Sequence, residues 1–260
     1  MKCFIIGYPL NKPRSVSLWR SFFKKKKLYN FTMHPKQVKK QNAEKIMNSF
    51  LLDKEFLASA VTMPLKKESA KFVKFGNNLT KIAGSINLIL KAKKNLIGYN
   101  TDISAALKTI QKIKNKKKIL IIGLGGTGKP LAKVLSKKYK KSKIVGVSSK
   151  KHQDLLSFKN IDIKRNILKV DLSSFNLLIN CTPIGSNLRK SYEKKSPISQ
   201  ENLNLLDKKA NVFDIVYKPR KTLLGKFCEK RKIKYHNGIN MNTLQAVEAL
   251  NIIYKNYKGI

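Results

Sequence analysis

The sequence predicts two α/β domains, the first built on a mainly parallel sheet and the second on a doubly wound parallel sheet. Three observations support this fold class. Apolar, β-favouring runs alternate with helical patterns along the whole chain, which is typical of parallel sheets covered by helices. A glycine-rich turn joins a strand to a helix at 123–128. With 260 residues, 42% of them hydrophobic, the chain is also long and apolar enough for two cores.

Short apolar strands and polar helical patterns alternate in the first hundred residues. The run KCFIIG leads into Tyr-Pro, which favours a turn, and the run LASAVTMP is stopped by its proline. A lysine-rich turn precedes the segment LIGYNTD at 96–102. The predicted elements are a strand at 2–7 followed by a loop and helix, a helix at 36–52, a strand at 57–64, a helix at 66–76 and strands at 85–90 and within 96–102.

A second alternating unit follows residue 102. The pattern ISAALKTIQKI predicts a helix that leads into this unit, so we expect the domain boundary near 102. The chain ends in a helix whose apolar face is predicted to carry Leu244, Val247, Leu250 and Ile253–Tyr254. The elements between are predicted as a strand at 118–122, a helix at 127–138, strands at 143–148, 176–181 and 211–216, a helix at 221–231 and a strand at 233–236.

Charge and cysteine usage exclude several classes of protein. The net charge of +42 by itself suggests nucleic-acid binding, but the lysine runs are scattered and only six of the 56 basic residues are arginine. We therefore expect a solvated basic surface and no specific nucleic-acid partner. The three cysteines and three histidines lack disulfide or metal-ligand spacing, so no metal is expected. No run is long enough for a membrane span or secretory signal, which predicts a cytoplasmic protein without a membrane partner.

The turn GLGGTG at 123–128 follows four apolar residues and precedes a helical pattern. Gly123 permits the tight turn, and Gly125 and Gly126 let the backbone approach a pyrophosphate without a Cβ. The helix that begins beside Thr127 directs free N–H groups and its positive dipole end at the anion. In this context the pattern predicts a Rossmann-type dinucleotide-binding domain, and therefore a nicotinamide-dependent oxidoreductase.

The end of the next strand, IVGVSSKKH at 144–152, indicates which nicotinamide cofactor is used. It contains no Asp or Glu to bind the 2′-hydroxyl of NAD. Its polar residues, which can bond and neutralise a 2′-phosphate, are Ser148, Ser149, Lys150 and Lys151. The segment therefore favours NADP.

A reductase that acts on a carbonyl needs a proton donor near the oxygen, and a lysine beside an aspartate can supply one. Lys66 follows a strand that ends in Thr-Met-Pro, and Asp102 follows the strand in LIGYNTD. Both lie at strand ends, where open α/β sheets bind ligands. These two residues are the candidate catalytic pair.

Eight segments, in this order, resemble the signature blocks of the shikimate dehydrogenase family. They are GYPLNKPRSVS, AVTMPLKKE, AGSINLI, GYNTD, IGLGGTGKP, NCTPIG, DIVYKPRKTLL and NGINMNTLQA, and they span about residues 4 to 250. The resemblance implies NADPH-dependent reduction of 3-dehydroshikimate to shikimate, a step in chorismate and aromatic amino-acid biosynthesis, by a monomer or homodimer. It also implies a substrate-binding catalytic domain of residues 1–101 plus 238–260, to which the C-terminal helix returns, and an NADP-binding domain of residues 102–237.

The resemblance also implies roles for individual residues. Lys66 and Asp102 match the family's catalytic lysine and aspartate. Positions that hold substrate hydroxyls match Thr62, Asn87 and Gln245, and positions that address the substrate carboxylate match Ser15, Ser17 and Tyr217. Cofactor positions match Gly123, Gly125, Gly126, Thr127, Ser148, Ser149, Lys150, Thr182, Ile215 and Gly238.

The chain departs from the family pattern at several of these blocks. An ungapped match places Pro13 and Ser15 at the two serine positions, whereas a one-residue insertion places Ser15 and Ser17 there. Ala60 stands where Asn is usual, and Ile103 stands where Gly is usual. The family's Asn-Arg-Thr after the second Rossmann strand is replaced by residues 148–150, Ser-Ser-Lys.

Two other functions are compatible with the residues. An NAD-dependent quinate/shikimate dehydrogenase would share the motifs, although the acid-free segment at 147–151 argues against it. A non-catalytic basic protein could keep the Rossmann scaffold and bind nucleic acid through its lysines, although the presence of both Lys66 and Asp102 argues against that.

Overall fold

The computed structural model describes residues 1–258. The chain divides into two compact units, the first comprising Met1–Ser104 with Leu244–Ile260 and the second Ala105–Thr243. Each unit contains one six-stranded sheet. The two divisions lie inside helices α5 and α9, so each of these helices contributes residues to both units.

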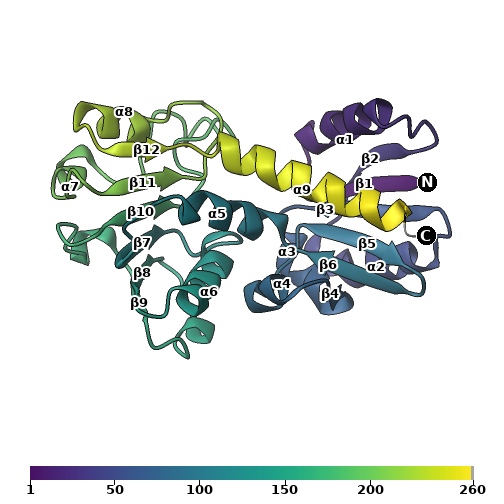
Figure 1. Ribbon diagram of the computed structural model, residues 1–260, viewed down its shortest axis with the longest axis horizontal. Helices are drawn as coiled ribbons and strands as arrows, with labels where there is room; N and C mark the ends of the chain where they lie inside the picture. Colours follow the sequence, from purple (N-terminus) through teal and green to yellow (C-terminus); the bar gives the residue numbers. More distant parts are fainter. Residues whose placement is uncertain (259–260) are drawn as a thin grey trace. The chain divides into compact units, whose positions relative to one another are not determined.

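The first unit alternates strands and helices as far as β5, which a hairpin joins to β6, and is completed by the last helix of the chain (Figure 1). Its elements are β1 (Lys2–Gly7), α1 (Arg14–Lys25), β2 (Thr32–Gln37), η1 (Lys40–Asn42), α2 (Ala43–Leu52), β3 (Phe56–Val61), α3 (Leu65–Glu68), η2 (Ser69–Phe72), β4 (Lys74–Phe75), α4 (Asn78–Ala83), β5 (Leu88–Ala92), β6 (Asn95–Tyr99) and most of α9 (Ile239–Lys258). The strand order is β2-β1-β3-β5-β6-β4.

The first sheet is mixed. β1 pairs in parallel with β2 and β3, and β4 pairs in parallel with β6, but β5 is antiparallel to both of its neighbours. The length of the connection explains the pairing of β5 with β6, since only Lys93 and Lys94 join these strands, and so short a loop can connect only antiparallel strands. The lysine-rich turn expected from the sequence is this hairpin.

Strand β2 was not among the predicted elements. Its sequence, TMHPKQ, contains one fully buried side chain, that of Met33, and a proline. Both features suit an edge strand, which needs neither a full apolar face nor every ladder hydrogen bond. The absence of apolar alternation explains why the sequence pattern missed it.

Helices cover both faces of the first sheet. On one face, Trp19 and Phe23 of α1 pack with strand residues such as Ile5 and Leu88. On the other, Met47 and Phe50 of α2 pack with Ile6, Phe56 and Ile89. Neighbouring residues of β1 and β5 thus point to opposite faces, as strand geometry requires. Both faces of the first sheet are therefore covered by apolar side chains of the helices.

Helix α9 packs on the first of these two faces through Ala249, Leu250 and Ile253. The predicted apolar face was wrong at Leu244 and Val247, which are 36% and 49% exposed. Hydrophobicity alone does not identify the buried face of this helix, because Ala246 and Ala249 are buried while the larger Leu244 and Val247 are more exposed.

The second unit begins within α5 (Thr101–Gln111) and continues to α9. Its other elements are β7 (Lys118–Ile122), α6 (Gly128–Lys138), β8 (Lys143–Val147), η3 (Gln153–Leu155), β9 (Ile161–Lys164), η4 (Ile167–Lys169), β10 (Leu177–Asn180), α7 (Gln200–Asn204), β11 (Asn211–Asp214), α8 (Leu223–Lys230) and β12 (Lys234–His236). The short β9 and α7 were not predicted, since each has fewer than six residues and no distinct periodicity.

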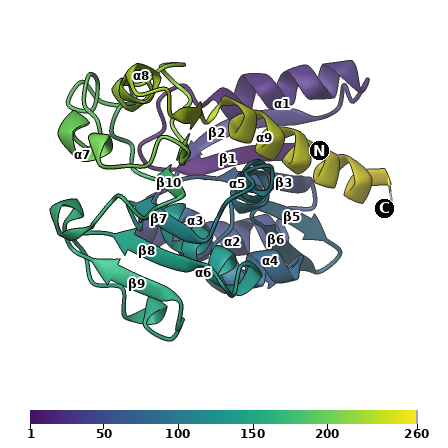
Figure 2. The ribbon, with the colours of Figure 1, turned by 60° about the vertical axis from the view of Figure 1, so that its left-hand side comes forward.

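The second sheet is parallel throughout, with strand order β12-β11-β10-β7-β8-β9. Figure 2 shows β7, β8 and β9 side by side in this sheet. The chain proceeds outward from β7 to β8 on one side and later returns to β10 on the other. The carboxyl end of β7 is therefore the switch point of a doubly wound sheet, where such folds bind ligands.

No helix within residues 1–258 is long and apolar enough to cross a membrane.

Candidate active site

Lys66 and Asp102 form an ion pair in the first unit. The Nζ atom of Lys66 lies 2.6 Å from Oδ2 of Asp102, and the two side chains are 19% and 18% exposed. Asp102 lies in the first turn of α5, where the helix dipole stabilises a carboxylate. The structure thus brings together two residues that are 36 positions apart in the sequence.

Backbone hydrogen bonds hold Lys66 in α3, the short helix that follows β3. The N–H of Leu65 donates to the carbonyl of Thr62, and the N–H of Ile86 donates to the carbonyl of Lys66, both at 2.9 Å. The side chain of Leu65 is fully buried and anchors α3 in the core. The lysine is therefore presented by a fixed turn and not by a free loop.

Asn100 holds the start of α5, a role that the sequence analysis did not assign. Its Oδ1 accepts a hydrogen bond from the N–H of Ile103 at 3.0 Å, and its Nδ2 donates to the carbonyl and hydroxyl of Ser85. This is an N-cap arrangement, which satisfies a helix N–H that has no partner within the helix. The asparagine directly before a helical pattern was the available signal.

Asn87, Thr101 and Gln245 form a polar network beside this helix start. The N–H of Thr101 donates to Oδ1 of Asn87 at 2.8 Å, and Nδ2 of Asn87 donates to Oγ1 of Thr101 at 2.9 Å. Both side chains lie within 3.4 Å of Oε1 of Gln245, which belongs to α9. The structure brings Asn87 and Gln245 together across 158 positions and adds Thr101, which the sequence analysis missed.

The other predicted substrate residues of the first unit are less constrained. Thr62 follows β3 and is half-buried, with its N–H bonded to the carbonyl of Ile6. Ser15 and Ser17 lie in the first turn of α1, where Ser15 is half-buried and Ser17 is exposed. The Ser17 hydroxyl donates to the carbonyl of Arg14 at 3.0 Å. The roles of these three residues stay predictions.

The glycine turn of the second unit connects β7 to α6 and leaves open space at its tip. Gly123 adopts a φ of +90°, which glycine tolerates best. Gly125 and Gly126 are exposed, and a Cβ built on either would meet nothing within 4 Å. Thr127 precedes α6 without a side-chain cap for the helix N–H groups. An uncapped N-terminus beside two open glycines fits a pyrophosphate.

The segment after β8 contains the four residues predicted to be able to bond a 2′-phosphate, of which Ser148, Ser149 and Lys150 match the family's cofactor positions and Lys151 is the fourth. Ser148 is half-buried, and its hydroxyl lies 2.8 Å from Nε2 of His152 and accepts from the N–H of Lys150 at 3.2 Å. Ser149 and Lys150 are exposed. Burial lowers the pKa of His152, with help from nearby lysines, so this imidazole is neutral near pH 7. The basic residues that this segment offers to a phosphate are therefore the exposed Lys150 and Lys151 and not His152.

Two further loops follow β10 and β11. Thr182 donates through both N–H and hydroxyl to Oδ1 of Asn180, at 2.9 and 2.7 Å. Ile215 and Tyr217 follow β11 and are half-buried. Gly238 lies so close to this loop that a Cβ on it would be 2.1 Å from the Ile215 carbonyl oxygen. These loops lie at the same carboxyl edge of the sheet as the glycine turn.

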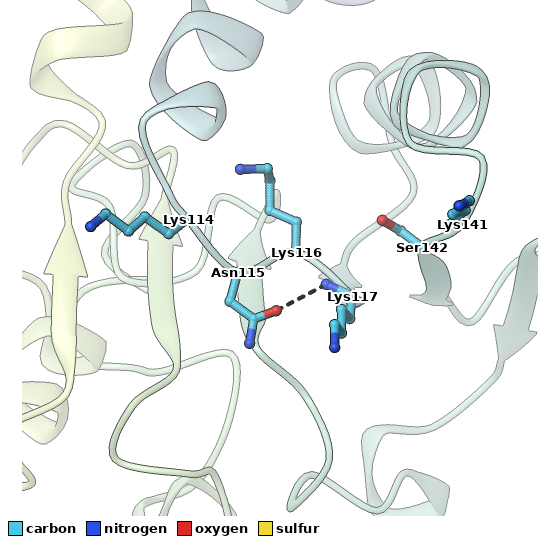
Figure 3. Close-up of a pocket in the computed structure, with 6 residues that line it drawn as sticks. All are labelled: Lys114, Asn115, Lys116, Lys117, Lys141 and Ser142. Atoms are coloured by element: carbon cyan, nitrogen blue, oxygen red, sulfur yellow. Dashed lines mark hydrogen bonds between the residues drawn. The ribbon is translucent and has the colours of Figure 1, made fainter.

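An open depression of about 430 Å³ lies elsewhere on the second unit (Figure 3). Its lining residues directly precede β7 and β8, so it lies at the amino ends of these strands, away from the glycine turn. They are Lys114, Asn115, Lys116, Lys117, Lys141 and Ser142. We do not assign it to the candidate site.

Shikimate dehydrogenases are similar to this chain at the level of a family model, of whole sequences and of solved structures. Residues 5–89 match the family model described as the shikimate dehydrogenase substrate binding domain. The chain is 30% identical over 250 residues to the shikimate dehydrogenase (NADP(+)) of Pyrococcus furiosus, which covers 95% of this chain and 88% of that protein. It is 26% identical to the enzyme of the same name from Methanococcus aeolicus, over 95% of this chain and 90% of that one. A crystal structure of a shikimate dehydrogenase in complex with NADP+ superposes with a TM-score of 0.81 at 25% identity, covering 97% of this chain and 89% of the other.

Proposed function

Because the chain belongs to the shikimate dehydrogenase family, we propose that it catalyses the NADPH-dependent reduction of 3-dehydroshikimate to shikimate. The observation that carries the proposal is the Lys66–Asp102 ion pair in the same unit as the network of Asn87, Thr101 and Gln245. A proton donor and several hydroxyl-binding groups are the chemistry that a polyhydroxylated ketone requires.

Lys66 is the proposed proton donor. NADPH, when bound, supplies the hydride that adds to the carbonyl carbon of the substrate. The Lys66 ammonium donates a hydrogen bond to the carbonyl oxygen and transfers its proton as that oxygen gains negative charge. Asp102 holds the ammonium in place and stabilises its positive charge before the transfer. In the reverse direction, neutral Lys66 accepts the proton from the hydroxyl.

Amide and hydroxyl side chains are proposed to hold the substrate. Asn87, Thr62 and Gln245 would bind its ring hydroxyls, because each can both donate and accept hydrogen bonds. Tyr217 and the hydroxyls of Ser15 and Ser17 would bind its carboxylate. The family resemblance proposes residues 1–101 plus 238–260 as this catalytic domain, of which 259–260 lie outside the described residues, and residues 102–237 as the NADP domain. The compact units of the structure divide a few residues later, after Ser104 and after Thr243, so that Asp102 belongs to the first unit and Gly238 to the second.

The cofactor site is proposed at the carboxyl edge of the second sheet. Gly123, Gly125, Gly126 and Thr127 would receive the pyrophosphate, for which the open glycines leave room. Ser148, Ser149 and Lys150 would contact the 2′-phosphate. Thr182, Ile215 and Gly238 would line the remainder of the cofactor site. A cytoplasmic location and a monomeric or homodimeric state remain predictions from the sequence.

The direct test is the consumption of NADPH by the purified protein with 3-dehydroshikimate, followed at 340 nm, and the formation of NADPH from NADP+ with shikimate. Quinate with NAD+ and shikimate with NAD+ are the comparison reactions. A preference for NAD+ would favour a quinate/shikimate dehydrogenase instead. A protein without turnover that binds neither nicotinamide would refute the proposal, and salt-resistant binding of random DNA would then support the nucleic-acid alternative.

Replacing Lys150 with alanine is expected to raise the KM for NADPH about tenfold, because one charge-assisted contact to a phosphate contributes about 1.5 kcal/mol. The KM for NADH should stay unchanged, since NADH has no 2′-phosphate. Lys141→Ala removes an exposed lysine from the opposite end of the sheet and should change neither value. Equal KM changes for NADPH and NADH in Lys150→Ala would contradict a 2′-phosphate contact.

A further inference from the structure

The second unit contains a buried carboxylate that the proposed chemistry does not use. Asp214 ends β11, and its side chain is fully buried. It accepts four hydrogen bonds, and the described residues place no Lys, Arg or His within ion-pair distance of it. Burial raises its pKa above the ordinary value, against the effect of these hydrogen bonds. Burying a carboxylate without a positive partner is unfavourable in free energy, so the presence of Asp214 here needs a physical explanation.

The two carboxylate oxygens have different kinds of partner. Oδ2 accepts from the hydroxyl of Thr222 at 2.8 Å and from the hydroxyl of Tyr235 at 3.0 Å. Thr222 caps α8 through the N–H of Gly225, and Tyr235 belongs to β12. These partners belong to the edge strand of the sheet and to the start of the helix that precedes that strand. Oδ2 therefore anchors the carboxylate in the unit.

Oδ1 contacts the two loops proposed to bind the cofactor. It accepts from the N–H of Val216 at 3.1 Å, in the loop after β11. It also accepts from Nδ2 of Asn180 at 2.9 Å, whose own Oδ1 accepts both the N–H and the hydroxyl of Thr182. The Thr182 hydroxyl in turn accepts from the N–H of Ile184 at 3.2 Å. A single oxygen atom is thus linked to the backbone of both loops.

Close packing links the loop after β10 to the glycine turn. A Cβ built on Gly123 would lie 2.6 Å from Cγ2 of Thr182, and one built on Gly128 would lie 2.9 Å from Cβ of Cys181. The loop after β11 has a similar contact with Gly238, whose N–H donates to the carbonyl of Val216 at 3.0 Å. Neither loop can shift without disturbing the segments that contain these glycines.

We propose that Asp214 is a positioning residue for the cofactor, and that its Oδ1 holds the loops 180–184 and 214–217 in the arrangement that accepts the dinucleotide. The inference rests on the proposed function, because it needs a nicotinamide cofactor to position. Asp214 acts through Asn180 and through the backbone of Val216, and touches no reacting atom.

The test compares variants that remove the hydrogen bonds to Oδ1 with a variant that removes a hydrogen bond to Oδ2 only. Asp214→Ala removes the hydrogen bonds to both oxygens. It is expected to raise the dissociation constant for NADPH about tenfold, as measured by fluorescence titration without turnover. Tyr235→Phe removes one Oδ2 partner and leaves Oδ1 and Thr222 in place. Its melting temperature should fall by about 3 °C, while its dissociation constant for NADPH changes less than about twofold.

Asp214→Asn is the conservative rescue. Its amide oxygen can accept from Asn180 and Val216, and its amide nitrogen can donate to the hydroxyls of Thr222 or Tyr235, which also accept hydrogen bonds. We expect its affinity for NADPH to remain near that of the wild type. If Asp214→Ala does not fold, Asn180→Ser provides the same comparison, because serine is too short to link Asp214 to Thr182. Asn180→Ser should also weaken NADPH binding about tenfold and speed hydrogen exchange in a peptide covering 181–184.

Three outcomes overturn the inference. The first is wild-type affinity in Asp214→Ala or, should that variant not fold, in Asn180→Ser. The second is a loss of NADPH affinity in Tyr235→Phe as large as that in Asp214→Ala or its replacement Asn180→Ser, which would indicate a purely structural role for Asp214. The third is a loss of NADPH affinity in Asp214→Asn as large as that in Asp214→Ala. A wild-type protein that binds no NADPH would refute the proposed function and this inference together, whereas the three outcomes refute the inference alone.

Discussion

Replacing Lys66 with alanine is expected to lower kcat for the reduction of 3-dehydroshikimate by about 10³-fold, the usual range for the loss of a general acid. The reason is that the ammonium paired with Asp102 would no longer be present to protonate the carbonyl oxygen. Steady-state kinetics with NADPH measure the effect. Circular dichroism and the melting temperature should remain close to those of the wild type, because the side chain contacts solvent as well as Asp102.

Two further variants make this test specific. Lys67→Ala removes the exposed neighbour of Lys66 in the same short helix and should retain nearly full activity. Lys66→Arg keeps a positive charge that can pair with Asp102, but a guanidinium does not release its proton at neutral pH. It should therefore be nearly as inactive as Lys66→Ala. Activity of Lys66→Ala above about a tenth of the wild-type value would contradict the role of proton donor.

Replacing Gly128 with alanine is expected to destabilise the second unit by about 3 kcal/mol, the upper range for overpacking a close-packed site. A Cβ there would lie 1.9 Å from the carbonyl oxygen of Gly123, which is backbone and cannot rotate away. Helix propensity favours alanine by only about 1 kcal/mol, so the clash dominates. Urea unfolding of the protein without cofactor measures the loss.

Gly125→Ala is the matched variant, with the opposite expected result. Its Cβ would meet nothing within 4 Å, so the stability without cofactor should stay within about 0.5 kcal/mol of the wild type. The methyl group would instead occupy space proposed for the pyrophosphate, and the dissociation constant for NADPH should rise about tenfold, or about 1.4 kcal/mol. Equal stability losses in both variants would contradict this division of roles within one turn.

The fold class was predictable because its signals are local. The glycine turn, the strand before it and the helix after it lie within one segment of about twenty residues, and the structure has them as β7 and α6. The edge strand β2 and the alanines on the buried face of α9 were not predictable, since polar edge residues and buried alanines have no distinctive local pattern; the burial of Leu250 and Ile253 on that helix was predicted correctly. In both cases the neighbouring elements, which a local pattern does not contain, determine what is buried.

Candidate residues were found where a motif contained them. Lys66 and Asp102 were identified from strand ends and from the resemblance, and the structure pairs them. Thr101, Asn180 and Asp214 lie inside the same motifs, yet their roles were missed. Their importance comes from hydrogen bonds to residues 14 to 34 positions away, which a list of residue types does not reveal.

The amino-acid order alone was sufficient for most of the alternation of strands and helices, for the glycine turn and for the family resemblance, because each depends on neighbours in the chain. The pairing of Lys66 with Asp102, the joining of Asn87 to Gln245 and the burial of Asp214 between two loops came only with the folded chain. Strand order explains the first and third of these contacts, and the return of α9 to the first unit explains the second. Sheets place β3 beside β5 and β11 beside β10, so residues far apart in sequence meet at one edge.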